Sequence, residues 1–322
     1  MRQFAKPTIV VSKCLEFDAC RYNGEMIPDV TIRNLQPFVT CIPVCPEVEI
    51  GLGTPRETIR IVEENGENRL VQPSTREDVT EKMEQFSNDF LQTIPDVDGF
   101  ILKNRSPSCG TRDVKIYSGF EKAPAKGKGA GLFGGAVVKK FSHLPIEEEG
   151  RLSNFIIREH FFTRLFTIAY YKMIKHNKNM KELVSFQSDN KYLFMAYNQV
   201  KQKELGRIIA NQKNEKIEVV FENYEKTLYE LFMRAPRYTS NVNVCEHIFG
   251  YFKTKLKKQE KDHFIELLQK YAEKKIPLSS LLTILKSWAI RFDEKYLLRQ
   301  TYFEPYPEAL VEISDSGKGR DY

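Results

Sequence analysis

The first half of the chain alternates short apolar runs with polar turns. Three runs, rich in β-branched and aliphatic residues, have the length of buried strands: 7–14, 38–44 and 100–103. Between the second and the third, apolar residues recur at helical spacing over 75–93, which predicts a helix. Two shorter runs flank Asn65-Gly66 and predict a hairpin. This alternation predicts a small, doubly wound, Rossmann-like α/β domain.

The composition of the chain and the spacing of its apolar residues change near residue 145. From there on glycine is rare, and Lys, Glu, Leu and aromatic residues recur at helical spacing. We therefore predict an α/β domain over 1–145 and an all-α domain over 146–322. The helices expected in the second domain are 151–176, 180–186, 191–203, 205–212, 216–233, 241–251, 258–273 and 277–292.

A glycine-rich segment, 123–135, precedes a short helical pattern at the end of the first domain. Its glycines have the spacing G-x-G-x-G and do not follow a predicted strand directly, so the dinucleotide-binding fingerprint is incomplete. We interpret the segment as a flexible loop that leads into a helix.

A cysteine lies at or after the end of each of the three predicted strands, and these are Cys14, Cys45 and, after a polar turn, Cys109. The carboxyl ends of parallel strands form the edge where α/β sheets bind ligands. Three thiolates at that edge can hold an iron–sulfur cluster and leave one iron without a protein ligand. Alternatively, each cysteine is a small buried residue near a strand end. No CxxC pair is present, so the pattern is not that of a zinc ribbon.

Three polar residues next to these cysteines are candidates for chemistry. Glu47 lies two residues after Cys45 and can act as a general base, or be a solvated loop residue. Ser106 and Ser108 can bind a substrate or a cluster sulfur, or simply cap the turn before Cys109. Among the other cysteines, Cys20 is a possible accessory thiol, Cys41 lies mid-strand, and Cys245 is expected in a helical core.

Composition and charge place limits on the partners. The 322 residues are 41% hydrophobic and 29% charged, which is typical of a soluble globular protein. No apolar run has the length of a membrane span, and no signal peptide is recognisable, so we expect a cytoplasmic protein whose six cysteines are thiols or metal ligands.

Residues 1–145 carry 19 basic and 19 acidic residues, so the surplus of +6 lies in the second half. There the run 253–261 contains Lys253, Lys257 and Lys258, which are candidates for contact with a nucleic-acid backbone. An exposed helix face without a partner is the alternative interpretation.

These segments together resemble a known pair of domains. VSKC with CRYNGE, CPEVEIGLGTPRE and LKNRSPSCG resemble the three signature segments of the thiouracil desulfurase family, across about 7–143. The second half is similar to the YbgA-type helical domain that is often fused to it, in segments such as KYLFMAYNQ and NVCEHIFGYFK. One departure is 13–17, KCLEF, where relatives commonly have Ala before the cysteine and Leu-Gly after it.

The resemblance implies a function and a site. It implies a 4Fe-4S cluster on Cys14, Cys45 and Cys109, with Glu47 and Ser106 as catalytic residues. It further implies a desulfidase that converts 4-thiouridine in tRNA to uridine, by Lewis-acid activation of the thiocarbonyl at the open iron and attack by water. Two alternatives stay open: a desulfurase of free thiouracil or another small thioamide, and a non-catalytic RNA-binding or regulatory protein with a structural metal.

Overall fold

A computed structural model describes residues 2–120, 124–211 and 214–312. The chain forms two compact units, and the division falls between Tyr170 and Tyr171. The first unit comprises the chain up to Tyr170 and the segment that begins at Pro307, and the second comprises Tyr171–Tyr306. The domain boundary at 145/146 stays a prediction. Within the described ranges, no helix has both the length and the apolar character needed to cross a membrane.

The centre of the first unit is a four-stranded parallel sheet in the order β2-β1-β6-β9. Its inner strands, β1 and β6, are almost wholly buried, because helices pack over the sheet and leave no polar face. The bounds of the strands are β1 Thr8–Ser12, β2 Thr40–Val44, β6 Gly99–Leu102 and β9 Ile146–Glu148. The three apolar runs of the sequence therefore form strands as predicted.

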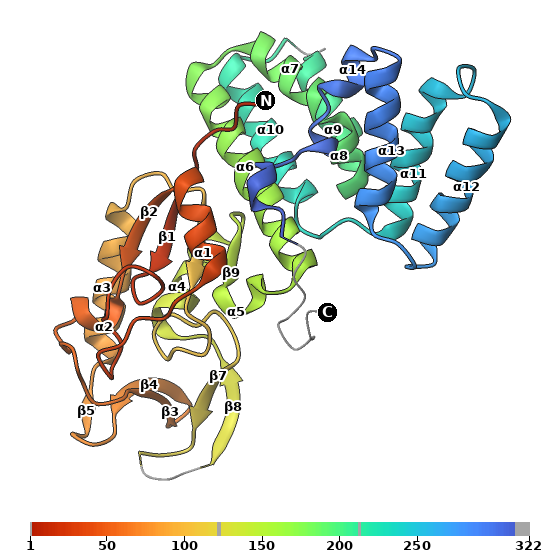
Figure 1. Cartoon of the computed structure of the whole chain (residues 1–322). Coiled ribbons are helices and arrows are strands. Elements are labelled where there is room, and N and C mark those ends of the chain that lie inside the picture. The colour runs from red at the N-terminus through yellow and green to blue at the C-terminus, as the bar shows by residue number, and fades with distance from the viewer. Residues whose placement is uncertain (1, 121–123, 212–213, 313–322) are drawn as a thin grey trace. The chain divides into compact units, whose positions relative to one another are not determined.

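Helices lie on both sides of this sheet, and Figure 1 shows α1 and α3 on opposite sides of β1 and β2. Phe86 and Phe90 of α3 pack on Phe133 of α4, with ring centroids 6.1 and 5.7 Å apart. The architecture is thus α/β, as the alternating pattern indicates. The helices of this unit are α1 Val30–Leu35, α2 Pro46–Glu49, α3 Thr80–Thr93, α4 Leu132–Phe141, α5 Glu149–Leu152 and the first part of α6, Phe155–Asn177.

A second sheet of five strands, in the order β5-β4-β3-β7-β8, belongs to the same unit (Figure 1). It contains the predicted hairpin, in which β3 and β4 pair antiparallel around Asn65 and Gly66. Its bounds are β3 Arg60–Glu64, β4 Glu67–Gln72, β5 Glu77–Asp78, β7 Val114–Tyr117 and β8 Ala125–Gly129. The prediction of a loop over 123–135 is wrong at 125–129, where β8 pairs antiparallel with β7, and at 132–135, which belong to α4. Residue 123 lies outside the described residues.

The second unit is helical and has its own core. Tyr171 and Tyr224 stack at 5.4 Å at its centre, and Cys245 is fully buried, as expected of a core cysteine. Asn198 ends one helix and caps the next, so the predicted helix 191–203 is two helices. The helices are α7 Met180–Asp189, α8 Lys191–Tyr197, α9 Gln199–Ala210, α10 Ile217–Leu231, α11 Tyr238–Phe249, α12 Lys258–Ala272, α13 Leu278–Arg291 and α14 Lys295–Leu298.

Candidate functional site

The carboxyl ends of three parallel strands meet at one edge of the first sheet. Ser12 of β1 is the register partner of Val44 of β2, and the hydroxyl of Ser12 accepts a hydrogen bond of 2.9 Å from the amide of Lys103, just after β6. The turns that leave these ends line a pocket of about 350 Å³, which we call the thiol pocket. Its lining includes Cys14, Cys20, Cys45, Cys109, Glu47 and Arg56.

Sequence reasoning predicted three cysteines at this edge, and all three line the thiol pocket together with Cys20. Burial, with a contribution from neighbouring Cys45, raises the pKa of Cys14 to about 12. Burial also raises the pKa of Cys20 to about 12 and that of Cys109 well above its usual value. Within the described ranges, no three Cys, His, Asp or Glu side chains form a group suited to a single metal ion.

Glu47 lies in this pocket and is held at both carboxylate oxygens. It stands in the first turn of α2, a short helix that begins directly after Cys45. Its Oε1 accepts a hydrogen bond of 2.6 Å from the hydroxyl of Ser108, and its Oε2 forms an ion pair of 2.7 Å with Arg56. The carboxylate is therefore fixed in orientation rather than solvated at a loop surface.

Ser106 and Ser108 have different roles in the turn before Cys109. The Oγ of Ser106 accepts hydrogen bonds from the amides of Cys109 and Ser108, at 3.1 and 3.3 Å, and so caps the turn. The hydroxyl of Ser108 lies 2.9 Å from that of Ser106 and is the one that reaches Glu47. The capping interpretation therefore has support at Ser106, whereas contact of either serine with a substrate or a cluster sulfur stays a prediction.

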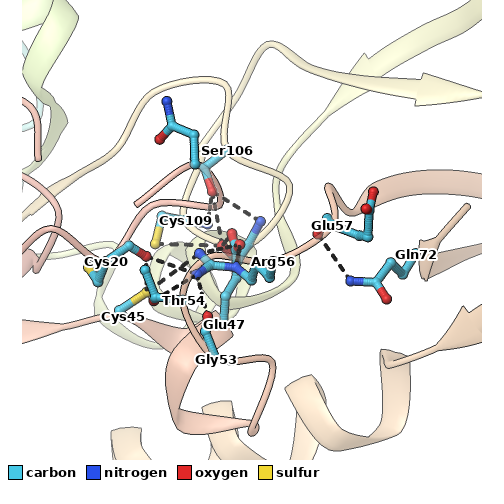
Figure 2. A network of polar contacts seen from close by, with 12 residues as sticks. Cys20, Cys45, Glu47, Gly53, Thr54, Arg56, Glu57, Gln72, Ser106 and Cys109 are labelled. Carbon is cyan, nitrogen blue, oxygen red and sulfur yellow. Dashed lines mark hydrogen bonds and ion pairs between the residues drawn. The ribbon is translucent and has the colours of Figure 1, made fainter. Parts of the chain in front are cut away.

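Arg56 is the residue of this site that sequence reasoning missed. Its side chain is 4% exposed and lies among Glu47, Cys20 and Cys45, as Figure 2 shows. Besides the ion pair, its guanidinium donates to the carbonyl oxygens of Cys20 and Gly53, at 2.9 Å each. Because a buried arginine needs a carboxylate partner, the available signal was a basic residue only nine positions after Glu47 in the sequence.

Residues of the glycine-rich segment form backbone hydrogen bonds with the turn that contains Cys109. The amide of Gly134 donates to the carbonyl of Ser108 at 2.9 Å, and that of Gly131 to the carbonyl of Gly110 at 2.7 Å. A Cβ at Gly134 would lie 2.4 Å from the carbonyl oxygen of Cys109. The glycines thus permit a close backbone approach between α4 and the turn.

Two comparisons with known proteins bear on the identity of this unit. A family model described as 2-thiouracil desulfurase matches residues 9–149. The protein YbbK of Bacillus subtilis, described as uncharacterized, is 36% identical over 118 residues, which cover 34% of this chain and 77% of that protein. The chain belongs to the 2-thiouracil desulfurase family.

The second half matches a different family. A model described as a protein of unknown function, DUF1722, covers 191–307 of this 2-thiouracil desulfurase family member. The uncharacterized protein YbgA of Escherichia coli is 22% identical over 156 residues, 48% of this chain and 92% of that protein. A solved structure, that of the 4Fe-4S-dependent thiouracil desulfidase TudS, is 26% identical in sequence to this chain. The match covers 46% of this chain and 93% of the TudS chain, with a TM-score of 0.35.

The three lysines predicted to bind substrate lie in the helical unit of this 2-thiouracil desulfurase family member. All are exposed: Lys257 and Lys258 stand at the start of α12, and Lys253 lies 5.7 Å from the ring of Phe249. The thiol pocket is built wholly from the first unit. Contact of these lysines with RNA stays a prediction.

Proposed function

We propose that this chain is a 4Fe-4S-dependent desulfidase that removes the sulfur of 4-thiouridine in tRNA and leaves uridine. The observation that carries the proposal is one pocket that holds the thiols of Cys14, Cys45 and Cys109 beside the fixed carboxylate of Glu47. The reaction exchanges the C4=S bond for C4=O, with water as the oxygen source and hydrogen sulfide as the second product. We place it in the cytoplasm, where reducing conditions keep cysteines as thiols.

The donor set of the pocket fits the cluster. Cys14, Cys45 and Cys109 would hold it, since thiolate is the usual ligand of iron–sulfur clusters. Burial opposes free thiolates here, as the raised pKa of Cys14 shows, and iron binding would offset that cost with release of protons. When bound, the cluster supplies a Lewis-acidic iron to which the substrate sulfur can coordinate.

The protein's own contribution to the chemistry is proton transfer at Glu47. Its carboxylate takes a proton from the water that attacks C4. Arg56 holds Oε2 of Glu47, so the carboxylate keeps one orientation. The hydroxyls of Ser108 and Ser106 continue the hydrogen-bond chain from Oε1. That chain offers a path for the proton toward the departing sulfur. Lys253, Lys257 and Lys258 would add contacts to the RNA backbone.

Free thiouracil is the second candidate substrate. The description of the matched family names 2-thiouracil. A pocket of about 350 Å³ also lies within the range typical of small-molecule sites. In this version the helical unit plays no part in substrate binding.

The test is anaerobic purification and cluster reconstitution, followed by assays on two substrates. Loss of the 4-thiouridine absorbance is followed in bulk tRNA and compared with the same signal from free 4-thiouracil. Activity on tRNA is the expected result, whereas activity on the free base alone would sink the tRNA assignment. A colourless, iron-free protein after reconstitution would remove both enzyme candidates and favour a non-catalytic role.

Two cysteine variants make this test specific. Cys109→Ala should abolish cluster absorbance, because it removes a proposed ligand. Cys41→Ala, at a half-buried position in β2 away from the thiol pocket, is the matched control and should keep the iron.

A further inference from the structure

A second pocket, of about 450 Å³, adjoins the thiol pocket in the same unit. The two pockets share the lining residues Thr58, Ile59, Arg105 and Pro107. We call the second one the basic pocket, because its charged lining is Arg60, Arg105, Lys115 and Lys128 against one acidic residue, Asp113. A ligand seated in the thiol pocket can therefore extend past Arg105 and Pro107 into a positively charged space.

The register of the second sheet sets these charges side by side. Lys115 of β7 and Lys128 of β8 are direct cross-strand partners. The pairing of Ile61 with Ile116 places Arg60 of β3 next to Lys115 on the other side. Like charges directly opposite each other in a sheet are destabilising, so three cations in one row lower the stability of the unliganded fold. An anion that binds across the row would relieve this repulsion.

Three cations of the basic pocket, Lys128, Lys115 and Arg105, are weakly neutralised or not neutralised by the residues that the structure describes. Lys128 forms an exposed ion pair of 3.1 Å with Asp113, a type of contact that contributes little. Lys115 and Arg105 are exposed and form no ion pair with the part of the chain that the structure describes. The lining therefore keeps a positive surplus. A neutral free base such as thiouracil has no negative charge to match it.

The pocket also offers an aromatic face. The guanidinium of Arg60 lies 4.8 Å from the ring centroid of Tyr117, which is half-buried. Cations that bind phosphate, next to an aromatic ring on which a base can stack, are the usual elements of a single-stranded nucleic-acid site.

We propose that the basic pocket binds a phosphate of the nucleotide whose thiolated base enters the thiol pocket, an assignment that rests on the proposed function. Arg105, Lys115 and Lys128 contact the phosphate oxygens. Arg60 and Tyr117 hold the sugar or the neighbouring base. The substrate is then a nucleotide within a chain rather than a free base, and this selection is made within the α/β unit itself.

The first test measures binding without catalysis. A fluorescently labelled oligoribonucleotide of about five residues, without a thiolated base, is titrated into the full-length reconstituted protein by anisotropy at several salt concentrations. The double variant Lys115→Ala/Lys128→Ala should weaken binding about tenfold and reduce the salt slope by about 1 to 2. The control is Lys126→Ala/Lys139→Ala, which removes the same charge from exposed positions outside the pocket. Equal losses in the two double variants would overturn the site.

The second test separates this proposal from the desulfidase assignment. The kcat/KM values of the Lys115→Ala/Lys128→Ala variant are compared for 4-thiouracil, 4-thiouridine monophosphate and a thiolated oligonucleotide. Both phosphate-bearing substrates should lose about tenfold relative to the free base, chiefly through KM. An equal loss for all three substrates would contradict a phosphate site. If the wild type acts on none of them, the proposed function fails, while the binding experiment still decides the basic pocket.

Discussion

At the scale of single residues, the site depends on how one carboxylate is held. Glu47 lies in α2, Arg56 in the segment that follows this helix, and Ser108 in the turn before Cys109. Ser108 and Arg56 contact different oxygens of the Glu47 carboxylate. The guanidinium that holds Glu47 also ties down the carbonyl of Cys20. Arg56 thus links the proposed base to the wall of the thiol pocket, and we assign it the role of positioning Glu47.

Replacing Arg56 with Lys should lower kcat about 10- to 100-fold while the iron content stays at the wild-type level. A lysine keeps the charge, but its single ammonium group cannot replace the two guanidinium nitrogens that contact Oε2 of Glu47 together with the one that donates to the carbonyl oxygens. The measurement is kcat per iron-loaded protein. Arg69→Lys, in a partly exposed pair with Asp78 at 2.7 Å, is the control for a general loss of an Arg–carboxylate contact. Unchanged kcat in the Arg56 variant would show that the orientation of Glu47 does not matter.

A variant of Cys20 tests whether three or four thiols hold the proposed cluster. The hydrogen bonds that Arg56 and the thiol of Cys45 donate to Cys20 reach its backbone carbonyl oxygen, which alanine retains. We therefore expect Cys20→Ala to keep iron and sulfide at wild-type amounts, while Cys14→Ala loses them. Loss of iron in the Cys20 variant would make Cys20 a ligand and leave no iron open for the substrate.

At the scale of elements, the apolar runs were enough to predict the buried strands of the first sheet, but not the exposed strand β8 of the second sheet. Strands β1 and β6 are buried on both faces, so their sequence is continuously apolar and easily recognised. Strand β8, AKGKG, is exposed and contains two glycines, and it forms because β7 is available as a partner. Such tertiary context is absent from local patterning.

The contact between α4 and the Cys109 turn gives a prediction at this scale. Gly134→Ala would bring a Cβ within 2.3 Å of the carbonyl oxygen of Gly110, so we expect a loss of about 1 to 3 kcal/mol in the free energy of unfolding, and a lower iron content. Gly135→Ala is the matched control in the same helix, where the nearest atom is 3.4 Å away. It should be neutral or stabilising by up to about 1 kcal/mol. Denaturant unfolding with iron analysis checks both, and equal stability of the two variants would contradict the close approach.

At the scale of the whole molecule, the sequence predicted an α/β part and a helical part. It could do so because apolar residues recur at different spacings in strands and in helices. It also predicted the meeting of Cys14, Cys45 and Cys109, since all follow strands of one parallel sheet. Arg56 was not predictable in the same way, because its burial depends on how its loop folds back. The basic pocket was not predictable either, since it depends on the register of β7 with β3, which is far away in the sequence, and with β8.

His160 makes the stability of the molecule depend on pH. It lies in α6, the helix within which the two units divide, and burial together with the charge of Arg164 lowers its pKa from 6.5 to about 4. Between these values the unfolded chain binds a proton that the folded chain does not, so the free energy of unfolding falls as the pH drops below 6.5. Above that pH the histidine is neutral in both states and contributes no pH dependence.

Between pH 7.5 and pH 5.5 the loss due to His160 should be about 1 kcal/mol, as expected for one pH unit below the unfolded pKa. Denaturant unfolding of the wild type and of His160→Gln at both pH values measures it. Other titrating groups affect both proteins alike and cancel in the difference, so the variant should lose about 1 kcal/mol less than the wild type. An identical loss in the two proteins would mean that His160 takes up its proton in the folded state at its ordinary pKa.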